Sequence, residues 1–204
     1  VSTLYHLAKQ GWSDVVLCER KELTSGSTWH AAGLMPLFNM SYSVGQIHKY
    51  SVKFYQELEK ETGQDVGFRE VSNIRLAETQ DRMDEYKQYA GVAETIGVKV
   101  NFLNPDEIKE IWPLCSTEGL IGAIQHPEDG CIQPNDLTQA LAKGARALGA
   151  EIYRQTAVTA LEQLPDDSWI VTTDKGEIKC DIVVSCSGNL SLIHISEPTR
   201  LRRI

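Results

Sequence analysis

The sequence predicts an α/β fold into which a mixed α+β portion is inserted. Helical patterns alternate with apolar strand patterns near both ends of the chain, as expected of helices that cover a sheet. The middle of the chain, residues 46–133, mixes strands and helices without that regular alternation. With 204 residues and 42% hydrophobic content, the chain can bury a substantial core.

The first third of the chain predicts a helix, a strand and a long helix. Leu4, Leu7 and Ala8 have helical spacing, and Gly11 marks a C-terminal stop. The stretch "DVVLCER" predicts a buried strand because its apolar residues follow one another without interruption. The long helix is expected over residues 43–61, with an apolar face formed by Ile47, Tyr50, Phe54 and Leu58.

The inserted portion has the clearest helix start in the chain. Asn104 is a favourable N-cap, Pro105 suits the first helical position, and the acidic residues that follow favour the positive end of the helix dipole. The other predicted elements are a strand region at 66–79, a charged helix at 80–97, and strands at 98–103 and 120–127.

The last third returns to a helix followed by strands. Leu137, Leu141 and Leu148 lie on one face of a helix that is expected to end at Gly149. Strands follow in "EIYRQTAVTALEQL", "SWIVTTDKG" and "EIKCDIVVSCSG", with a turn at residues 174–176. These elements predict one discontinuous domain from residues 1–45 and 134–189, incomplete at both ends.

Composition argues against several kinds of partner. The net charge is −8, and both signs are scattered along the predicted helices, whereas nucleic-acid binding needs a basic face. No apolar run approaches the length of a membrane span. The five cysteines form no CxxC pair and no histidine joins them at ligand spacing, so we predict no metal site and expect reduced thiols.

Residues 190–204 are predicted to be foreign to the rest of the chain. The string "LSLIHISEPTR" resembles the conceptual translation of a transposase adapter used in sequencing libraries, and it follows "CDIVVSCSGN" without a turn signal. His194 is therefore left out of the site. The tail carries one acidic and three basic residues, so the remaining chain has a net charge near −10, which is −8 minus +2.

Glu19 stands where a dinucleotide-binding fold places an acidic residue. At the end of a buried strand, such a carboxylate accepts hydrogen bonds from ribose hydroxyls. The glycine-rich loop of the same motif is expected about 20 residues earlier, before Val1. Only half of the motif lies within this sequence. A solvated glutamate at the end of a strand is therefore an equal alternative to a ribose-binding Glu19.

A longer stretch carries a family resemblance. "LYHLAKQGWSDVVLCERKELTSGSTWHAAGL" resembles the N-terminal flavin domain of the dimethylglycine and sarcosine dehydrogenases, within the D-amino-acid-oxidase-like flavoproteins. The similarity continues through "VGFREVSNIRLA", "IKEIWPL", "GAIQHPEDGCIQPNDLTQALAKGARALGA" and "IVVSCSG", and it covers nearly all of residues 1–189. "SGSTWHAAG" is far narrower than a bare GxGxxG. The resemblance implies a truncated Rossmann-like FAD-binding domain with part of a substrate domain inserted at 46–133.

The resemblance also implies roles for individual residues. Glu19 would hold the adenosine ribose of FAD, Val158 would contact the adenine through backbone atoms, and Gly188 would end the last strand of the FAD domain near the cofactor. The loop that approaches the pyrophosphate and ribityl chain would consist of Ser25, Gly26, Ser27 and Thr28.

His30 falls where these dehydrogenases attach FAD covalently through a histidine ring nitrogen. A neutral imidazole is a competent nucleophile near neutral pH, and such a link would hold the cofactor and favour electron uptake from an amine. The alternative is that His30 packs beside Trp29 or caps a backbone group. His6 and His48 are expected to be structural, and His126 is expected to begin a turn.

The resemblance implies an enzyme that oxidises the N-methyl group of a small amino acid, dimethylglycine or sarcosine, to an iminium. The products would be formaldehyde or a folate-bound one-carbon unit, with folate bound in a C-terminal region that this sequence lacks. The catalytic residues would lie beyond residue 189. Residues 1–189 by themselves are therefore expected to have no activity and to bind FAD poorly. The expected location is the bacterial cytoplasm, or alternatively the mitochondrial matrix.

A non-enzymatic relative is the second possibility. The regulatory subunit of pyruvate dehydrogenase phosphatase shares this fold and acts as a binding partner. Its equivalent of "STWHAAG" lacks the histidine, so His30 favours the enzyme.

Overall fold

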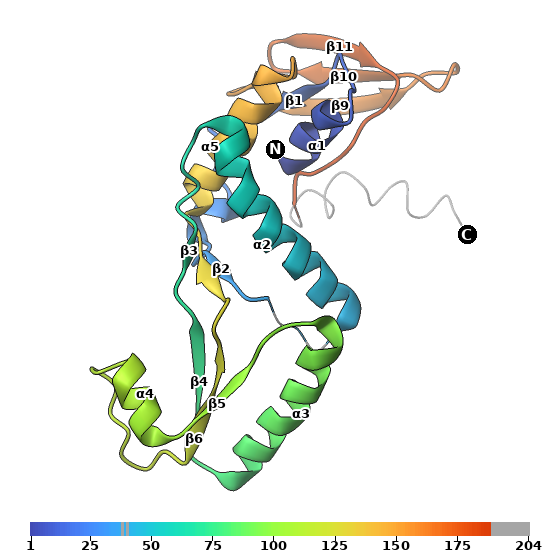
Figure 1. Ribbon diagram of the computed structural model, residues 1–204. Helices are drawn as coiled ribbons and strands as arrows, with labels where there is room; N and C mark the ends of the chain where they lie inside the picture. The colour runs from blue at the N-terminus through green and yellow to red at the C-terminus, as the bar shows by residue number, and fades with distance from the viewer. Residues whose placement is uncertain (38, 40, 189–204) are drawn as a thin grey trace. The chain divides into compact units, whose positions relative to one another are not determined.

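The computed structural model describes residues 1–37, 39 and 41–188, so the tail at 190–204 lies outside the described residues. The chain divides into two compact units. The first comprises Val1–Leu17 and Glu22–Arg154, and the second comprises Cys18–Lys21 and the described residues from Gln155 to Gly188 (Figure 1). These units are defined by internal contacts, so the predicted functional division at residues 45, 133 and 189 stays a prediction.

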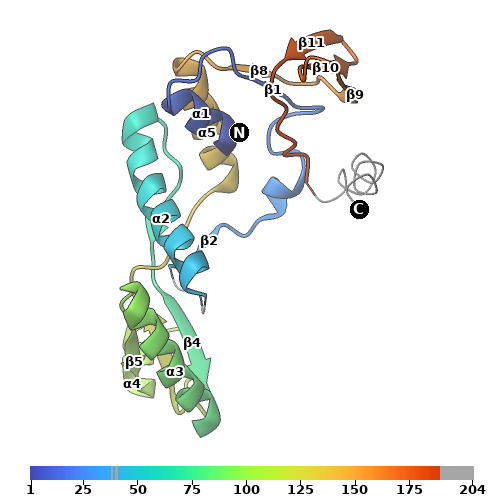
Figure 2. The same ribbon diagram turned by 90° about the vertical axis from the view of Figure 1, so that its right-hand side faces the viewer.

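Three helices form the larger core of the first unit. They are α1 (Ser2–Lys9), α2 (Tyr42–Thr62) and α5 (Pro134–Ala147), and α5 packs against both of the others (Figure 2). Gly144 of α5 allows the closest approach, because a Cβ there would lie 2.5 Å from the ring of Tyr5. The buried side chains of this core include Leu4, Tyr5, Ala8, Phe54, Leu58, Val66, Ile132, Ala140, Leu141 and Ala145.

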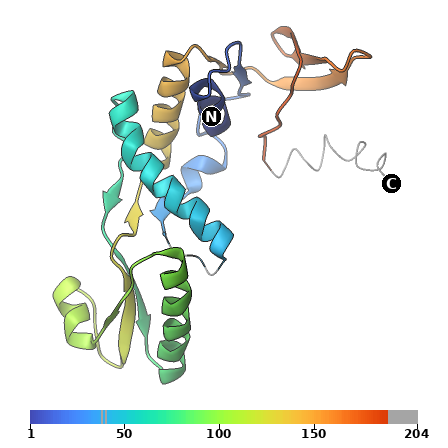
Figure 3. The same ribbon diagram turned by 45° about the vertical axis from the view of Figure 1, so that its right-hand side comes forward.

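The inserted portion is a three-layer arrangement around one antiparallel sheet. The strands are β4 (Asn73–Ala77), β6 (Gly122–His126) and β5 (Asn101–Leu103), in the order β4-β6-β5. Figure 3 shows α3 (Gln80–Ile96) and α4 (Pro105–Ile111) flanking these strands. Successive residues of β6 point to opposite faces of the sheet, since Ala123 packs with Ile108 of α4 and Ile124 packs with Tyr86 of α3.

The predicted start of α4 is confirmed. The side chain of Asn104 accepts hydrogen bonds from the N–H groups of Asp106 and Glu107, and the Glu107 carboxylate accepts one from the Asn104 N–H. This reciprocal capping box, with Pro105 at the first position, satisfies N–H groups that a helix leaves without partners at its start.

Two small sheets join distant parts of the first unit. β1 (Val16–Cys18) pairs with β8 (Glu151–Tyr153). In the other sheet, β7 (Gly130–Cys131) lies between β2 (Leu34–Met35) and β3 (Arg69–Glu70) and is antiparallel to both. The residues just after the "STWHAAG" motif are therefore paired with residues almost a hundred positions later.

The second unit is an antiparallel meander. Its strands are β9 (Val158–Gln163), β10 (Trp169–Thr173) and β11 (Gly176–Cys180), in the order β11-β10-β9. Thr173 pairs with Gly176 across the turn, so the predicted turn at 174–176 is confirmed.

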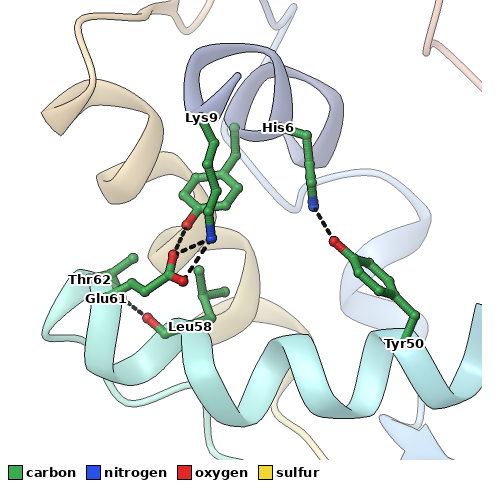
Figure 4. Close-up of polar contacts among 7 residues, drawn as sticks. His6, Lys9, Tyr50, Leu58, Glu61 and Thr62 are labelled. Atoms are coloured by element: carbon green, nitrogen blue, oxygen red, sulfur yellow. Dashed lines mark hydrogen bonds and ion pairs between the residues drawn. The ribbon is translucent and has the colours of Figure 1, made fainter. Parts of the chain in front are cut away.

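A polar cluster links α1 to α2. The ammonium of Lys9 lies 2.7 Å from both carboxylate oxygens of Glu61, and the Tyr5 hydroxyl donates to the same carboxylate (Figure 4). The hydroxyl of Tyr50 lies 3.4 Å from Nε2 of His6, which also packs on the ring of Phe54. His6 is thus structural, as predicted.

The burial predicted from the sequence was wrong at three elements. Val16 of β1 is 40% exposed, although a buried strand was predicted there. On α2, Ile47 and Tyr50 are 62% and 60% exposed, whereas Phe54 and Leu58 of the same face are buried. Leu148 lies beyond α5 and is exposed. Apolar periodicity identifies the face of a helix, but burial requires a second element to cover that face.

The predicted strand in "IVVSCSG" does not form among the described residues. No strand is present over 182–188, and Ile182 and Val184 are exposed. A strand is stable when a neighbouring strand satisfies its backbone groups, so an apolar run without such a neighbour stays irregular.

Candidate functional site

The conspicuous "SGSTWH" stretch forms an exposed helical turn. Residues 27–30 make a short 3-10 helix, η1 (Ser27–His30), and the N–H of Ala31 continues it by donating to the Thr28 carbonyl at 3.1 Å. Every residue from Ser25 to His30 is exposed. The first amides of a helical turn have no partner within the turn, so this end suits an approaching anion.

The start of this turn is tied down by side chains. Thr24 donates from its hydroxyl to the Oδ1 atom of Asn135 at 3.1 Å. Just before it, the Glu22 carboxylate pairs with the Arg154 guanidinium at 2.7 Å, and Leu23 is buried. The exposed turn therefore begins directly after residues that are held in place in the first unit.

The end of the turn is tied to residues 130–132. The carbonyl of Gly33 accepts a hydrogen bond from the Ile132 N–H at 2.8 Å, and β2 then pairs with β7. Gly33 has a φ of +73°, and the carbonyl oxygen of Ile132 lies inside the space that a Cβ would need. Glycine is thus required here by both conformation and space.

The rings of Trp29 and His30 lie against each other. Their centroids are 3.9 Å apart, with an angle of 35° between the planes. Trp29 is 64% exposed and His30 is also exposed, so the stack stands on the surface of the turn. The contact accords with packing beside Trp29, and it leaves the His30 imidazole accessible to a bound group.

Gly26 provides a direct test of whether a phosphate-bearing cofactor fits this turn. Its φ is −88°, and a Cβ at this position would meet nothing within 4 Å. Internal packing in the described residues therefore does not demand glycine at this position. The open space beside the backbone fits the close approach of a group such as the pyrophosphate of FAD.

The other three candidate residues belong to the second unit. Glu19 folds over its own loop, where its carboxylate accepts the Lys21 N–H at 2.9 Å, and its carbonyl accepts the Thr156 N–H at 2.8 Å. Val158 begins β9 two residues later, and Gly188 has a φ of +81°. The unit thus brings the backbones near Glu19 and Val158 together, while Ser25–His30 belong to the first unit.

The sequence missed a buried pair, His126 and Asp129. His126 is the last residue of β6 and begins the predicted turn, since its carbonyl accepts the Asp129 N–H at 3.3 Å, but its side chain is only 1% exposed. Asp129 is 2% exposed, and its Oδ1 atom accepts the Leu37 N–H at 2.8 Å. An aspartate followed by glycine is typical of turns, so no local signal pointed to this burial.

The charges of this pair differ from those of an ordinary ion pair. Burial, assisted by the nearby Arg75, lowers the pKa of His126 to about 4. Burial also raises the pKa of Asp129, against the lowering effects of the Leu37 N–H, Arg75 and His48. His126 is therefore neutral at pH 7, and its 3.8 Å contact with Asp129 is not a salt bridge at that pH.

Two wider features of the described residues bear on the kind of protein. No helix in the described ranges is both long and apolar enough to cross a membrane. Within the same ranges, no three His, Cys, Asp or Glu side chains gather as ligands for a metal ion.

Comparisons with known proteins give consistent results. Residues 1–202 match the family described as FAD dependent oxidoreductase. The chain is 42% identical over 188 residues to the mitochondrial dimethylglycine dehydrogenase of Rattus norvegicus, covering 92% of this chain and 22% of that protein. It is 36% identical over 192 residues to the mitochondrial sarcosine dehydrogenase of Homo sapiens, covering 91% of this chain and 21% of that protein.

A third relative has a different role. The mitochondrial regulatory subunit of pyruvate dehydrogenase phosphatase from Mus musculus is 36% identical over 187 residues, which are 92% of this chain and 21% of that protein. The chain thus spans about a fifth of the length of these curated relatives.

Solved structures resemble the same part of the chain. The L-proline dehydrogenase of P. horikoshii matches with a TM-score of 0.86 and 26% identity, covering 94% of this chain and 50% of that one. The glycine oxidase of Geobacillus kaustophilus matches with a TM-score of 0.80 and 28% identity, covering 94% and 53%.

Proposed function

This chain belongs to the FAD dependent oxidoreductase family, and from that premise we propose that the complete protein oxidises the N-methyl group of a small amino acid. By the complete protein we mean the product of the whole reading frame that contains this sequence. The predicted fold class, an FAD-binding α/β domain with an inserted portion, is confirmed by the family and its structural neighbours. The observation that carries the proposal is the exposed His30 on η1, within a chain 42% identical to a dimethylglycine dehydrogenase.

The cofactor would be FAD, attached through a ring nitrogen of His30. Ser25, Gly26, Ser27 and Thr28 would present amides and hydroxyls to its phosphates, and the open space at Gly26 supports this assignment. Glu19, Val158 and Gly188 would serve the adenosine and the end of the FAD domain. The exposure of His30 supports attachment, because an imidazole enclosed by protein atoms could not contact a bound cofactor.

Bound FAD supplies a two-electron acceptor for such a reaction. On the substrate, a hydride leaves the N-methyl carbon while the nitrogen lone pair forms the C=N bond of an iminium. Water then adds to that carbon, and formaldehyde and the demethylated amine separate; alternatively, the one-carbon unit passes to folate bound elsewhere in the complete protein. The chain's own contribution is to orient the cofactor on the exposed turn and to hold that turn in place.

The proposed substrates are dimethylglycine and sarcosine, because relatives named for both match this chain. We place the complete protein in the bacterial cytoplasm, with the mitochondrial matrix as the alternative that its mitochondrial relatives support.

A regulatory protein is the second candidate function. The match to the pyruvate dehydrogenase phosphatase regulatory subunit supports it. His30 weighs against it, because a histidine available for covalent attachment of FAD would serve a flavoenzyme and would have no role on a regulatory surface.

The test compares the complete protein with its His30→Ala variant. Flavin fluorescence should remain on the wild-type band after denaturing electrophoresis and should disappear from the variant. His6→Asn removes a histidine from α1 and should keep the fluorescent band. Dye reduction that depends on dimethylglycine or sarcosine separates the two functions: no reduction with any N-methyl amine would favour the regulatory protein.

A further inference from the structure

The backbone of Asp129 is held by hydrogen bonds to two stretches of the chain. Its carbonyl accepts hydrogen bonds from the N–H groups of Val71 and Ser72 at 3.1 and 2.8 Å. Its own N–H donates to the His126 carbonyl at 3.3 Å, and its side chain is 2% exposed. A carboxylate on a backbone fixed in this way can hold a hydrogen-bond donor at a defined position.

What Asp129 binds is the segment that carries His30. We define the attachment segment as residues 24–37 and the anchoring segment as residues 129–135. Oδ1 of Asp129 accepts the Leu37 N–H at 2.8 Å, although the two residues are 92 positions apart. The Leu37 side chain is buried in a core with Val52, Ala93, Ile96 and Val98. The attachment segment therefore ends at a point that is fixed through both backbone and side chain.

The remaining anchors of the attachment segment lie on the same anchoring segment. Thr24 contacts Asn135 at 3.1 Å, the Gly33 carbonyl accepts the Ile132 N–H at 2.8 Å, and β2 pairs with β7. The exposed residues 25–32 thus form a loop whose two ends are held by residues only a few positions apart. Since covalent attachment requires a well-oriented nucleophile, the placement of these anchors sets where His30 presents its imidazole.

We propose that Asp129 is a positioning residue for covalent flavin attachment: it fixes the end of the attachment segment and so orients the turn that carries His30. This inference rests on the proposed attachment of FAD at His30. Asp129 itself touches no reacting atom. Without its carboxylate, the buried Leu37 N–H loses its acceptor, and the end of the attachment segment is held less tightly.

The experiment uses three variants of Asp129 in the complete protein. Asp129→Asn keeps an oxygen acceptor of the same shape. Asp129→Leu and Asp129→Ala both remove the acceptor, the first by adding volume and the second by leaving a cavity, so an effect that they share comes from the acceptor. Ile108→Ala is the control, because it weakens the separate core under α4 and has no contact with the attachment segment in the described residues.

Two measurements are needed. Hydrogen exchange should be about tenfold faster at residues 34–37 in Asp129→Leu and Asp129→Ala, as expected for the loss of one buried hydrogen bond. Covalent flavin, followed on denaturing gels while FAD is added to the apoprotein, should accumulate several-fold more slowly in these variants. Asp129→Asn should match the wild type in both, and Ile108→Ala should leave exchange at residues 34–37 unchanged.

The outcomes separate this inference from the function on which it rests. Wild-type exchange at residues 34–37 and wild-type attachment rates in Asp129→Leu would overturn the role of Asp129. Slow attachment in Ile108→Ala, equal to that in Asp129→Leu at equal thermal stability, would also overturn it, since general destabilisation would then explain the effect. A wild-type protein without covalent flavin would refute attachment at His30, whereas the exchange measurement would still test the Asp129 anchor.

Discussion

Gly33 and Ile132 approach so closely that residue 33 has no room for a side chain. The Ile132 N–H donates to the Gly33 carbonyl at 2.8 Å, and the Ile132 carbonyl oxygen lies in the space of a Cβ on residue 33. This contact brings the end of the "STWHAAG" motif onto β7. It explains the last glycine of the motif by packing rather than by contact with a cofactor.

Gly33→Ala should therefore destabilise the complete protein by about 3 kcal/mol, because the strained φ and the steric overlap act together. Gly11 is the matched control, since it has a φ of +88° and nothing within 4 Å of an added Cβ. Gly11→Ala should cost about 1 kcal/mol, the conformational part alone. Urea denaturation measures both, and equal costs would contradict the close contact.

The Trp29–His30 stack should affect how fast flavin is attached. Trp29→Ala removes the ring that lies 3.9 Å from the imidazole, whereas Trp29→Phe keeps an aromatic face. An aromatic pair contributes about 0.5–1.5 kcal/mol, so Trp29→Ala should slow covalent attachment roughly three- to tenfold. Time courses of flavin fluorescence on denaturing gels measure this. Identical rates in all three proteins would show that the stack has no part in attachment.

The neutral, buried His126 should make stability depend on pH. Its pKa is about 4 when folded and near 6.5 when unfolded, so between these values the unfolded chain binds more protons. Stability is then lost as the pH falls through this window, by about 2 kcal/mol between pH 7 and pH 5.

Asp129 acts in the opposite direction. Its pKa is raised in the folded state, so the folded chain binds more protons in the window above the ordinary carboxyl pKa, and stability falls as the pH rises there.

The His126 prediction is tested by urea denaturation at pH 7 and pH 5, which should show a smaller loss of unfolding free energy in His126→Gln than in the wild type. Equal losses in the two proteins would mean that His126 is not buried in its neutral form.

The Glu61 cluster should stabilise the contact between α1 and α2. The Lys9 ammonium, and after it the Tyr5 hydroxyl, lower the pKa of the Glu61 carboxyl by hydrogen bonding. Because Lys9 and Glu61 are 44% and 38% exposed, Glu61→Ala should cost only about 1 kcal/mol. Glu57→Ala, at an exposed position of the same helix, should change the free energy of unfolding by less than about 0.5 kcal/mol. Thermal or urea denaturation that ranks the two variants equally would contradict the role of the cluster.

Much of the fold was predictable from local sequence patterns. Asn104 followed by Pro105 located the start of α4, and the glycine-containing turn located the hairpin between β10 and β11. These features depend on backbone propensity and capping, which act over a few residues. The resemblance of the "SGSTWHAAG" stretch likewise identified the family, since its residues are contiguous.

The candidate site was predictable only in part. The sequence singled out the turn that carries His30, and the structure shows that this turn is exposed. The roles of Glu19, Ser25–Thr28, His30, Val158 and Gly188 toward FAD stay predictions. The sequence did not reveal Asp129, because a local Asp-Gly pair has the same composition whether it lies in a solvated turn or in a core.

By itself, then, the sequence determined which segments become helices, where several of them begin, and to which family the chain belongs. Tertiary structure alone decided that Ile47 and Tyr50 are exposed while Phe54 and Leu58 are buried on the same helix. It also decided that Leu37 meets Asp129 and that Gly33 meets Ile132. The physical reason is range: propensity and capping act between neighbours in the chain, whereas burial and buried hydrogen bonds depend on which distant segment covers a given face.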